Sequence, residues 1–306
     1  MRKVLNDIAL NKEFVKNGFI RTSFLSTEEV DELKKLFFDT LPLSGGQITA
    51  AETEIKTINE ITYDFTFIDK NPDYKKKVFD IITNKFKKRM DELLCDYKPI
   101  IANYIRKKTN SGEVPLHQNW AFADEEKCYT VSIWCPLVDS TVDNGTLQVV
   151  PGSHKRFGKI RGPKVPWELD SIKKDIIENY LVPLETKAGD CVILDDSIVH
   201  YSAINKTNDL RLAIQLICIP SEYPSIHYHF NSNKNTVEIL EVDVNFYMEF
   251  NPWKDPGDNK ILGELAYDYE MINCEQFEKR LNGPSYDNQN NKIGLLNKFK
   301  KFFLKN

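Results

Sequence analysis

The sequence lacks long apolar runs and has no large surplus of charge of either sign. Across the chain no apolar stretch approaches the about 20 residues that span a bilayer, and the first residues, MRKVLNDIALNKEF, contain no apolar segment of the signal-peptide type. Lys and Arg number 41 against 45 Asp and Glu, a net charge of −4. A general nucleic-acid binder would carry a basic surplus. These absences predict a cytoplasmic protein with no nucleic-acid partner.

Cysteine is also scarce, and its spacing excludes two kinds of site. No two of the 6 cysteines stand in a C-x-x-C spacing, so a zinc site or a disulfide framework has little support. Most of them lie inside apolar, strand-like runs such as YTVSIWCPL and LAIQLICIP. This pattern predicts free, buried thiols in a reducing compartment. A hydrophobic fraction of 41% with 28% charged residues is typical of a globular chain.

The first part of the chain predicts a short strand and two amphipathic helices. Residues 17–25 (NGFIRTSFL) read as the strand, and Ser26 to Glu29 (STEE) forms a capping box before an apolar pattern at positions 30, 33, 36 and 37. Residues 73–95 carry a second pattern of the same period. Each helix is expected to pack one apolar stripe against a sheet.

From about residue 98 short β-rich runs alternate with turn signals, which favours a sandwich or barrel, and the last of these runs, TVEILEVDVNFYMEF at 236–250, is expected to be one strand. Asn144-Gly145 predicts a hairpin turn, and Gly189-Asp190 predicts a turn into CVILDD. No internal repeat or linker divides the chain. We therefore expect one α+β, mainly β domain over 1–306, with helical and strand additions at 1–97, a cupin-like jelly-roll core at 98–250 and a C-terminal extension at 251–306 that wraps the outside.

Two of the five histidines stand in contexts that suggest a metal site. His117 lies in PLHQNWAF, and His200 lies far along the chain in DDSIVHYS. Iron(II) oxygenases use two histidines and one carboxylate on one face of the metal, and an H-x-(D/E) pair with a distant histidine is the sequence form of that site. Residue 119 shares a strand face with residue 117. The third ligand here is Asn119 rather than an acid.

A co-substrate site follows from the residues after His200. Arg211 opens the run RLAIQLICI, an expected strand in which Arg211, Ala213 and Gln215 share the face opposite the leucines and isoleucine at 212, 214 and 216. Ser202 shares a strand face with His200. An arginine there can grip a carboxylate through two charged hydrogen bonds, and the serine can donate a third. A keto acid that chelates Fe(II) and ends on Arg211 and Ser202 would be 2-oxoglutarate.

Four stretches in order, HQNW, WCPLVD, DNGTLQVVPGSH and HYS followed by Arg211, resemble the phytanoyl-CoA dioxygenase family. The resemblance covers roughly residues 98–220. It implies an Fe(II)/2-oxoglutarate oxygenase on a double-stranded β-helix, with iron at His117 and His200 and 2-oxoglutarate at Arg211 and Ser202. It also implies that Trp134 lies beside the co-substrate. The chain departs from the family pattern at Asn119, where the family has Asp.

Three readings of Asn119 are open. It serves as a neutral ligand of a working oxygenase, or the metal takes its carboxylate from elsewhere, or the site binds without turnover. Candidates for the second reading are nearby acids: Asp124, Glu125 and Glu126. A neutral ligand should hold Fe(II) less firmly than a carboxylate does, because it removes one charge attraction.

Two further groups of residues have competing interpretations. The basic loop KRFGKIRGPK, with Arg156 and Arg161, either meets an anionic group of the substrate or is a solvated loop. His227 and His229 form an H-x-H pair, but the spacing that follows does not fit a cupin metal site, so an exposed edge strand or the outer lip of the pocket is expected.

The C-terminal tail NKIGLLNKFKKFFLKN has the pattern of a basic amphipathic helix, which either packs on the domain or touches a membrane surface. Taken together, the sequence predicts an Fe(II)/2-oxoglutarate-dependent oxygenase that oxidises, and most simply hydroxylates, a C–H bond of a small organic substrate with release of succinate and CO₂. The alternative is an impaired relative that binds a metabolite or metal without turnover.

Overall fold

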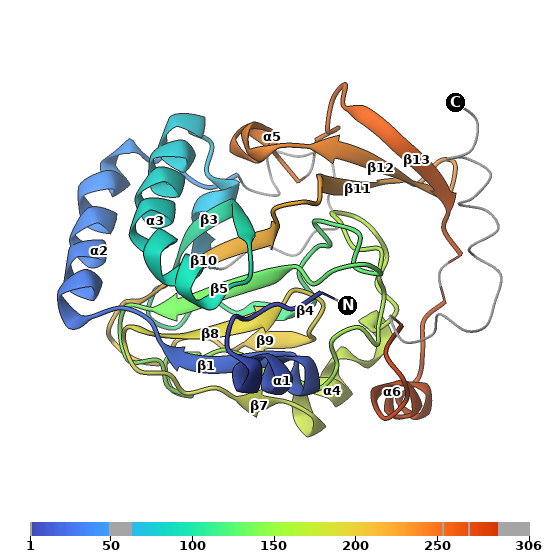
Figure 1. Ribbon diagram of the computed structural model, residues 1–306, viewed down its shortest axis with the longest axis horizontal. Helices are drawn as coiled ribbons and strands as arrows, with labels where there is room; N and C mark the ends of the chain where they lie inside the picture. Colours follow the sequence, from blue (N-terminus) through green and yellow to red (C-terminus); the bar gives the residue numbers. More distant parts are fainter. Residues whose placement is uncertain (1, 49–62, 253, 269, 287–306) are drawn as a thin grey trace.

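Two antiparallel sheets form the centre of the chain (Figure 1), in a computed structural model that describes residues 2–48, 63–252, 254–268 and 270–286. The larger sheet has six strands in the order β1-β8-β5-β10-β3-β2, and the smaller has four in the order β4-β9-β6-β7. The strands of the larger sheet are β1 (Phe19–Ser23), β2 (Asp64–Phe65), β3 (Tyr97–Lys107), β5 (Val131–Pro136), β8 (Asp190–Asp195) and β10 (Arg211–Pro220). Those of the smaller are β4 (Val114–His117), β6 (Gln148–Val149), β7 (Val182–Pro183) and β9 (His200–Ser202).

Side chains alternate along β10 between two different environments, as strand geometry requires. Leu212, Ile214 and Leu216 pack into a core on the outer side of the larger sheet. Ala213 instead packs with Val149 of the smaller sheet, in a cluster that also holds Trp134. The inner faces of the two sheets therefore meet, and the space between them is where Arg211 and the histidines lie.

Three N-terminal helices cover the outer face of the larger sheet: α1 (Ile8–Asn17), α2 (Thr27–Thr40) and α3 (Pro72–Leu93) (Figure 1). The predicted capping box at the start of α2 is confirmed, because the Ser26 side chain accepts from the Glu29 N–H and the Glu29 carboxylate accepts from the Ser26 N–H. Val78, Ile82 and Phe86 of α3 are fully buried. The expected apolar stripes thus face the sheet.

The later part of the chain adds a smaller layer beside this core. A three-stranded sheet, β11 (Ser225–Asn231), β12 (Thr236–Val242) and β13 (Lys260–Ala266), lies next to α5 (Val244–Glu249) in Figure 1. The remaining helices are α4 (Lys173–Asn179), α6 (Cys274–Leu281) and the 3₁₀ turns η1 (Leu41–Leu43), η3 (Thr66–Ile68) and η4 (Asp170–Ile172).

The expected hairpin at Asn144-Gly145 is wrong. The strands on either side of it, β5 and β6, belong to different sheets, so the loop carries the chain across the core. Gly145 has a φ of 75°, and a Cβ on it would lie 2.2 Å from the Ala203 carbonyl oxygen. Glycine is needed here because the loop passes close to the chain after β9, not because two neighbouring strands turn.

Two expectations for the region after residue 220 also need correction. The run 236–250 is not one strand: it ends at Val242, and Asp243 then caps α5 by accepting from the Phe246 N–H at 2.9 Å. His227 is not exposed either, since only 2% of its surface is accessible. It lies on β11 against the rings of Trp120 and Phe250.

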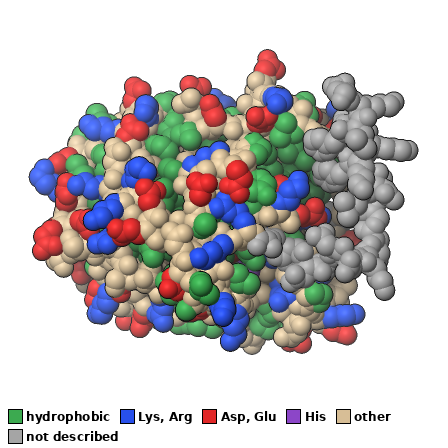
Figure 2. Space-filling view, in the orientation of Figure 1, with side chains coloured by type: hydrophobic (Ala, Val, Ile, Leu, Met, Phe, Trp, Pro, Cys, Tyr) green, Lys and Arg blue, Asp and Glu red, His purple; other side chains and the backbone are tan. Residues whose placement is uncertain are grey.

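The prediction of an α+β, mainly β chain with a jelly-roll core and flanking N-terminal helices is confirmed by these sheets. The division at residues 97 and 250 stays a prediction, and β1 from the N-terminal part pairs with β8 of the core. Figure 2 shows acidic and basic side chains interspersed over one face. Within the described ranges no helix is long and apolar enough to cross a membrane, and the basic tail at 291–306 lies outside those ranges.

Candidate metal and co-substrate site

Two neighbouring strands of the smaller sheet bring His117 and His200 together. The last residue of β4 and the first residue of β9 are paired in the antiparallel register, and the two imidazole centroids lie 4.1 Å apart. The residues are 83 positions apart in sequence, and only the β4–β9 pairing makes them neighbours. Both side chains line the same cavity between the sheets.

Hydrogen bonds fix which ring nitrogen of each histidine carries its proton. The Nδ1 atom of His117 lies 2.7 Å from the Pro115 carbonyl, and that of His200 lies 2.9 Å from the Ile198 carbonyl. A carbonyl only accepts, so each Nδ1 is protonated and each Nε2 keeps its lone pair. Burial lowers the pKa of His117, against hydrogen bonds to Pro115 and Asn119 that raise it, and burial holds the pKa of His200 well below its usual range. Two neutral imidazoles are the form that binds a metal.

Asn119 lies just beyond the end of β4 and lines the same cavity. Its amide nitrogen donates to Asp196 Oδ1 at 2.8 Å and to Ser132 Oγ at 3.1 Å. It lines that cavity together with His117 and His200. Because the amide nitrogen is turned to Asp196, the amide oxygen is the atom on the histidine side, where it can act as a third ligand.

The acids weighed as alternative ligands are all engaged in ion pairs. These pairs are Asp124 with Lys127, Glu125 with Arg161, and Glu126 with Lys159. Across the part of the chain that the structure describes, no group of three or more His, Cys, Asp or Glu side chains is arranged to hold a metal. The reading in which a carboxylate from this loop completes the site therefore finds no support.

Arg211 is the strongest sign of an anion site. It is 2% exposed, its guanidinium lies 5.8 Å from the Trp134 ring centroid, and its NH2 donates to Ser202 Oγ at 3.4 Å. Among the described residues its Nε and NH1 atoms have no hydrogen-bond partner. Burial lowers its pKa to about 9. A buried guanidinium without a partner is unfavourable, and a carboxylate would supply the two acceptors it lacks.

Lys107 is a second buried cation at this place, and the sequence analysis missed it. Lys107 stands opposite Arg211 in the register of β3 and β10. Its Nζ donates to the Ala203 carbonyl at 2.6 Å, to the Ser202 carbonyl at 3.0 Å and to the Ser202 hydroxyl. Burial and the nearby Arg211 lower its pKa to about 6. In the sequence the run RKK at 106–108 looks like an exposed strand end. Only the alternation that puts Lys107 on the same strand face as Asn103 and Ile105 could have predicted that Lys107 is buried.

A cavity of about 430 Å³, here called the aromatic cavity, collects six of the predicted site residues: His117, Asn119, Trp134, His200, Ser202 and Arg211. The rest of its wall is largely apolar: Tyr63, Phe65, Phe67, Ile68, Ile105, Val114, Trp120, Phe122, Leu147, Pro163, Leu194 and Pro252, together with Gln118, Lys164 and Gln215. The histidines come from the smaller sheet and Arg211 from the larger one, so the cavity lies between the two sheets.

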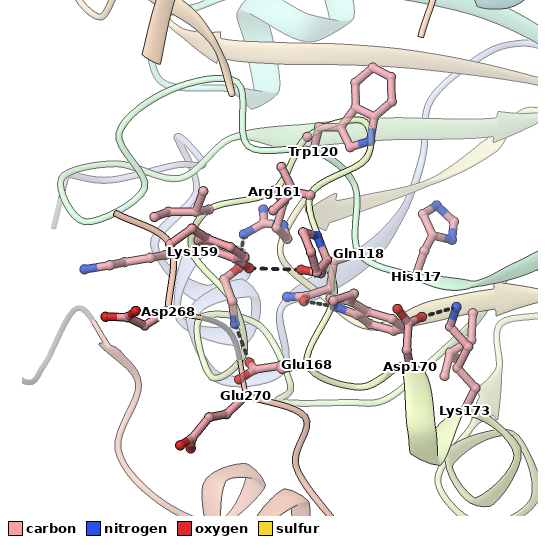
Figure 3. A pocket seen from close by; sticks show the side chains of 18 residues that line it. His117, Gln118, Trp120, Lys159, Arg161, Glu168, Asp170, Lys173, Asp268 and Glu270 are labelled. Atoms are coloured by element: carbon pink, nitrogen blue, oxygen red, sulfur yellow. Dashed lines mark hydrogen bonds and ion pairs between the residues drawn. The ribbon is translucent and has the colours of Figure 1, made fainter. Parts of the chain in front are cut away.

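A second cavity of about 390 Å³, here called the polar cavity, adjoins the chain segment 117–120 and is drawn in Figure 3. It shares His117, Gln118 and Trp120 with the aromatic cavity and is otherwise lined by both acidic and basic side chains. Figure 3 labels Lys159, Lys173, Glu168, Asp170, Asp268 and Glu270 around it.

Arg156 lines neither cavity, and the guanidinium of Arg161 is hydrogen-bonded to other protein groups. Arg161 lines the polar cavity, but its NH2 pairs with Glu125 at 2.8 Å and its Nε donates to the Asn119 carbonyl at 2.7 Å. Arg156 Nε donates to the Gly152 carbonyl at 3.0 Å and lines neither cavity. From this basic loop it is Lys164 that lines the aromatic cavity.

Comparisons with known proteins show which family the chain belongs to. The family model for phytanoyl-CoA dioxygenase (PhyH) matches residues 14–213. A phytanoyl-CoA dioxygenase domain-containing protein 1 homolog from Dictyostelium discoideum is 30% identical over 273 residues, covering 72% of this chain and 93% of that protein. Phytanoyl-CoA dioxygenase 1 of Oryza sativa subsp. japonica is 33% identical over 126 residues, but only 40% of this chain and 45% of that protein are covered.

Solved structures show the same fold. The epimerase SnoN in complex with Fe3+, alpha ketoglutarate and nogalamycin RO is 16% identical with a TM-score of 0.53, covering 71% of this chain and 86% of that one. HygX from Streptomyces hygroscopicus with nickel and 2-oxoglutarate bound is 12% identical with a TM-score of 0.50, covering 71% of this chain and 88% of that one. At such identities the likeness is one of fold.

The fold and the family match define the class: this is a 2-oxoglutarate-dependent, non-haem iron dioxygenase built on a double-stranded β-helix. Within that class the chain belongs to the phytanoyl-CoA dioxygenase family.

Proposed function

We propose that His117, Asn119 and His200 hold Fe(II) and that Arg211 and Ser202 hold the far carboxylate of 2-oxoglutarate, with Trp134 along its side. The donor set fits the group, because two neutral imidazoles and an amide oxygen meet in one cavity with an anion site. The solved relatives above contain iron or nickel with this co-substrate, which supports the assignment.

When bound, Fe(II) and 2-oxoglutarate supply the oxidising chemistry, in which dioxygen is consumed and succinate and CO₂ are released. The chain's own residues do the rest. The Pro115 and Ile198 carbonyls hold the two rings in the ligating tautomer. Arg211 sets the direction of the co-substrate, and the apolar wall of the aromatic cavity limits water near the reacting bond.

The observation that carries this proposal is the buried Arg211 guanidinium, whose Nε and NH1 face no partner among the described residues. A structural arginine at 2% exposure would be paired, as Arg161 is with Glu125. Arg211 instead points at a space that also contains two metal-competent histidines. A dicarboxylate that reaches from the metal to this guanidinium explains both features.

The substrate we propose is a small organic molecule with an apolar body, hydroxylated at a C–H bond. The wall that is left after the co-substrate residues is mostly aromatic and aliphatic, for example Phe65, Phe67 and Phe122. An anionic substrate group would depend on Lys164, which lines this cavity, since Arg161 is paired with Glu125 and Arg156 lies elsewhere. Rings or chains that bury apolar surface are the compounds to screen.

The test is anaerobic titration of the Fe(II)-loaded protein with 2-oxoglutarate, followed by oxygen and a succinate assay. Chelation by the keto acid gives a visible charge-transfer band, and turnover gives succinate. We expect the band in the wild type, its loss at the same co-substrate concentration in Arg211→Met, and its retention in Arg21→Met, a matched change on the exposed β1. No band in the wild type would overturn the proposal. A band without succinate, even with screened substrates, would leave the binding-module alternative.

A further inference from the structure

Asn119 lies at one end of a chain of buried and half-buried polar side chains that we call the Asp196 cluster: Asn103, Asn119, Ser132, Asp196 and Gln215. Asn103 donates to Gln215 at 3.3 Å, Gln215 donates to Ser132 at 3.3 Å, and Ser132 donates to Asp196 Oδ1 at 2.6 Å. Asn119 donates to the same Asp196 oxygen at 2.8 Å. Every hydrogen bond of the cluster thus runs toward one carboxylate.

This direction determines how the Asn119 amide is turned. A carboxamide can present either its oxygen or its nitrogen to a neighbour, whereas an ionised carboxylate only accepts. With Asp196 as acceptor, the Asn119 nitrogen must face Asp196. The oxygen is then the amide atom left for the aromatic cavity, which Asn119 lines together with His117 and His200. Without the acid behind it, nothing in the cluster would choose between the two orientations.

The same carboxylate has an unmet need of its own. Asp196 is 0% exposed, and its Oδ2 atom has no hydrogen-bond partner in the described structure. Burial raises the pKa of Asp196 to about 7, against hydrogen bonds from Ser132 and Asn119 that lower it, so the ionised carboxylate with one oxygen unsatisfied is unfavourable unless a cation lies near it. A divalent metal held by two neutral rings and a neutral amide would be stabilised by a nearby negative charge, because none of its protein ligands offsets its positive charge.

We propose that Asp196, supported by Ser132, is the positioning residue that makes Asn119 a metal ligand, and that it places the negative charge of the site one side chain behind the ligand. The inference rests on the proposed function, since it concerns the same metal. The proposal explains why position 119 has an amide where the family has an acid: the carboxylate of the site stands at position 196 and accepts a hydrogen bond from the Asn119 amide.

The first test measures metal affinity rather than turnover. Co²⁺ is titrated into the full-length apoprotein, and binding is followed by calorimetry and by the visible ligand-field bands of the ion. Asp196→Asn should weaken Co²⁺ binding by about 10- to 100-fold, the range typical for loss of a group that orients a ligand. Ser132→Ala should weaken it less, because Asp196 remains. Asp31→Asn, on the exposed face of α2, is the matched control and should change nothing.

The second test exchanges the two residues. In Asn119→Asp alone, two carboxylates would lie at the present 2.8 Å contact and repel each other, so the gain from an acidic ligand should be small. In the double variant Asn119→Asp/Asp196→Asn, the new amide can donate to the new acid. The double variant should bind Co²⁺ at least as tightly as the wild type, and far more tightly than Asp196→Asn, with restored ligand-field bands.

The outcomes separate this inference from the proposed function. If the wild type binds Co²⁺ and Asp196→Asn binds it equally well, with no gain in the double variant, the inference is overturned and the proposed function stands. If the wild type itself binds no Co²⁺, the proposed function fails first. Near-ultraviolet circular dichroism checks the fold of each variant. If Asp196→Asn does not fold, the comparison of Ser132→Ala and the double variant with the wild type decides.

Discussion

At the scale of single residues, the site brings two buried basic side chains close together. Lys107 and Arg211 stand opposite each other on β3 and β10, and each is nearly inaccessible to solvent. Their mutual repulsion contributes to the lowered pKa of Lys107. An arriving dianion would remove that repulsion, so co-substrate binding and the protonation of Lys107 are linked.

A first prediction follows from this linkage. The pKa of Lys107 is lowered to about 6, so at pH 7 the free protein holds it largely neutral. A carboxylate bound beside it raises that pKa, and binding of 2-oxoglutarate at pH 7 should therefore take up a fraction of a proton. Calorimetry in buffers of different ionisation enthalpy measures the uptake.

Lys107→Met provides the check on this prediction, because the methionine cannot take up a proton. The uptake at pH 7 should disappear in that variant while binding, weaker than in the wild type, is still seen. Equal uptake in both proteins would show that another group is responsible.

A second prediction concerns His227, which is buried among aromatic rings. Burial, with a smaller contribution from His229, lowers its pKa to about 3. In the unfolded chain a histidine titrates at about 6.5. The unfolded state therefore takes up this proton first as the pH falls, and the free energy of unfolding should drop by up to about 1.4 kcal/mol per pH unit from about pH 6.5 downward.

His227→Phe should make this decline shallower between pH 6 and pH 4, measured by denaturant unfolding at several pH values. His229→Phe, a change on the same strand at a partly exposed position, is the control and should leave most of the slope in place. An unchanged slope in His227→Phe would mean that this residue titrates normally in the folded protein.

The site residues differ in how far the sequence could show them. His117, His200, Ser202 and Arg211 stand in short motifs whose spacing has a chemical meaning, and the structure lines one cavity with them. Ser132 lies within β5 and Asp196 lies in the turn directly after β8, neither in a recognisable motif, and their role depends on a contact between residues 64 positions apart. No local pattern encodes such a contact, so only the folded chain reveals it.

At the scale of elements, local patterns predicted those whose signal lies within the element. The alternation of β10 and the capping box of α2 are of this kind, and both appear as expected. The prediction of one strand over 236–250 was wrong because α5 is short and mostly apolar, and only Asp243 marks its start. The prediction of a hairpin at Asn144-Gly145 was wrong because a turn sequence does not determine whether the strand that follows joins the same sheet.

A third prediction belongs to α2. The Ser26 side chain satisfies the Glu29 N–H, which otherwise has no partner inside the helix. Ser26→Ala should lower the free energy of unfolding by about 1 kcal/mol. Chemical denaturation measures it, with Thr27→Ala as control, since Thr27 is the exposed first helical residue and does not cap. Equal losses in the two variants would contradict the capping role.

At the scale of the whole molecule, the two sheets each supply one part of the site. The histidines lie on β4 and β9 of the smaller sheet, and Arg211 begins β10 of the larger one. A co-substrate that chelates the metal and ends on Arg211 would therefore join the two sheets. Such a ligand stabilises the folded chain as a whole, because it binds only when both sheets are in place.

A fourth prediction tests this bridging. With Co²⁺ and 2-oxoglutarate at about 100 times the dissociation constant, the free energy of unfolding should rise by about 2.7 kcal/mol. Hydrogen exchange should slow in β9 and β10 together, whereas Co²⁺ alone should protect mainly β4 and β9. Protection confined to the smaller sheet with both ligands present would contradict the bridge.

The segment from His117 to Trp120 borders both the aromatic and the polar cavity. Three of its residues, His117, Gln118 and Trp120, line both cavities, and Trp120 has the largest of these side chains. We expect replacement of the Trp120 indole by a small side chain to join the two cavities while His117, Asn119 and His200 stay in place. Evolution or design could in this way admit a longer or more polar substrate without altering the metal ligands, so that the choice of molecule and the chemistry performed on it can change independently.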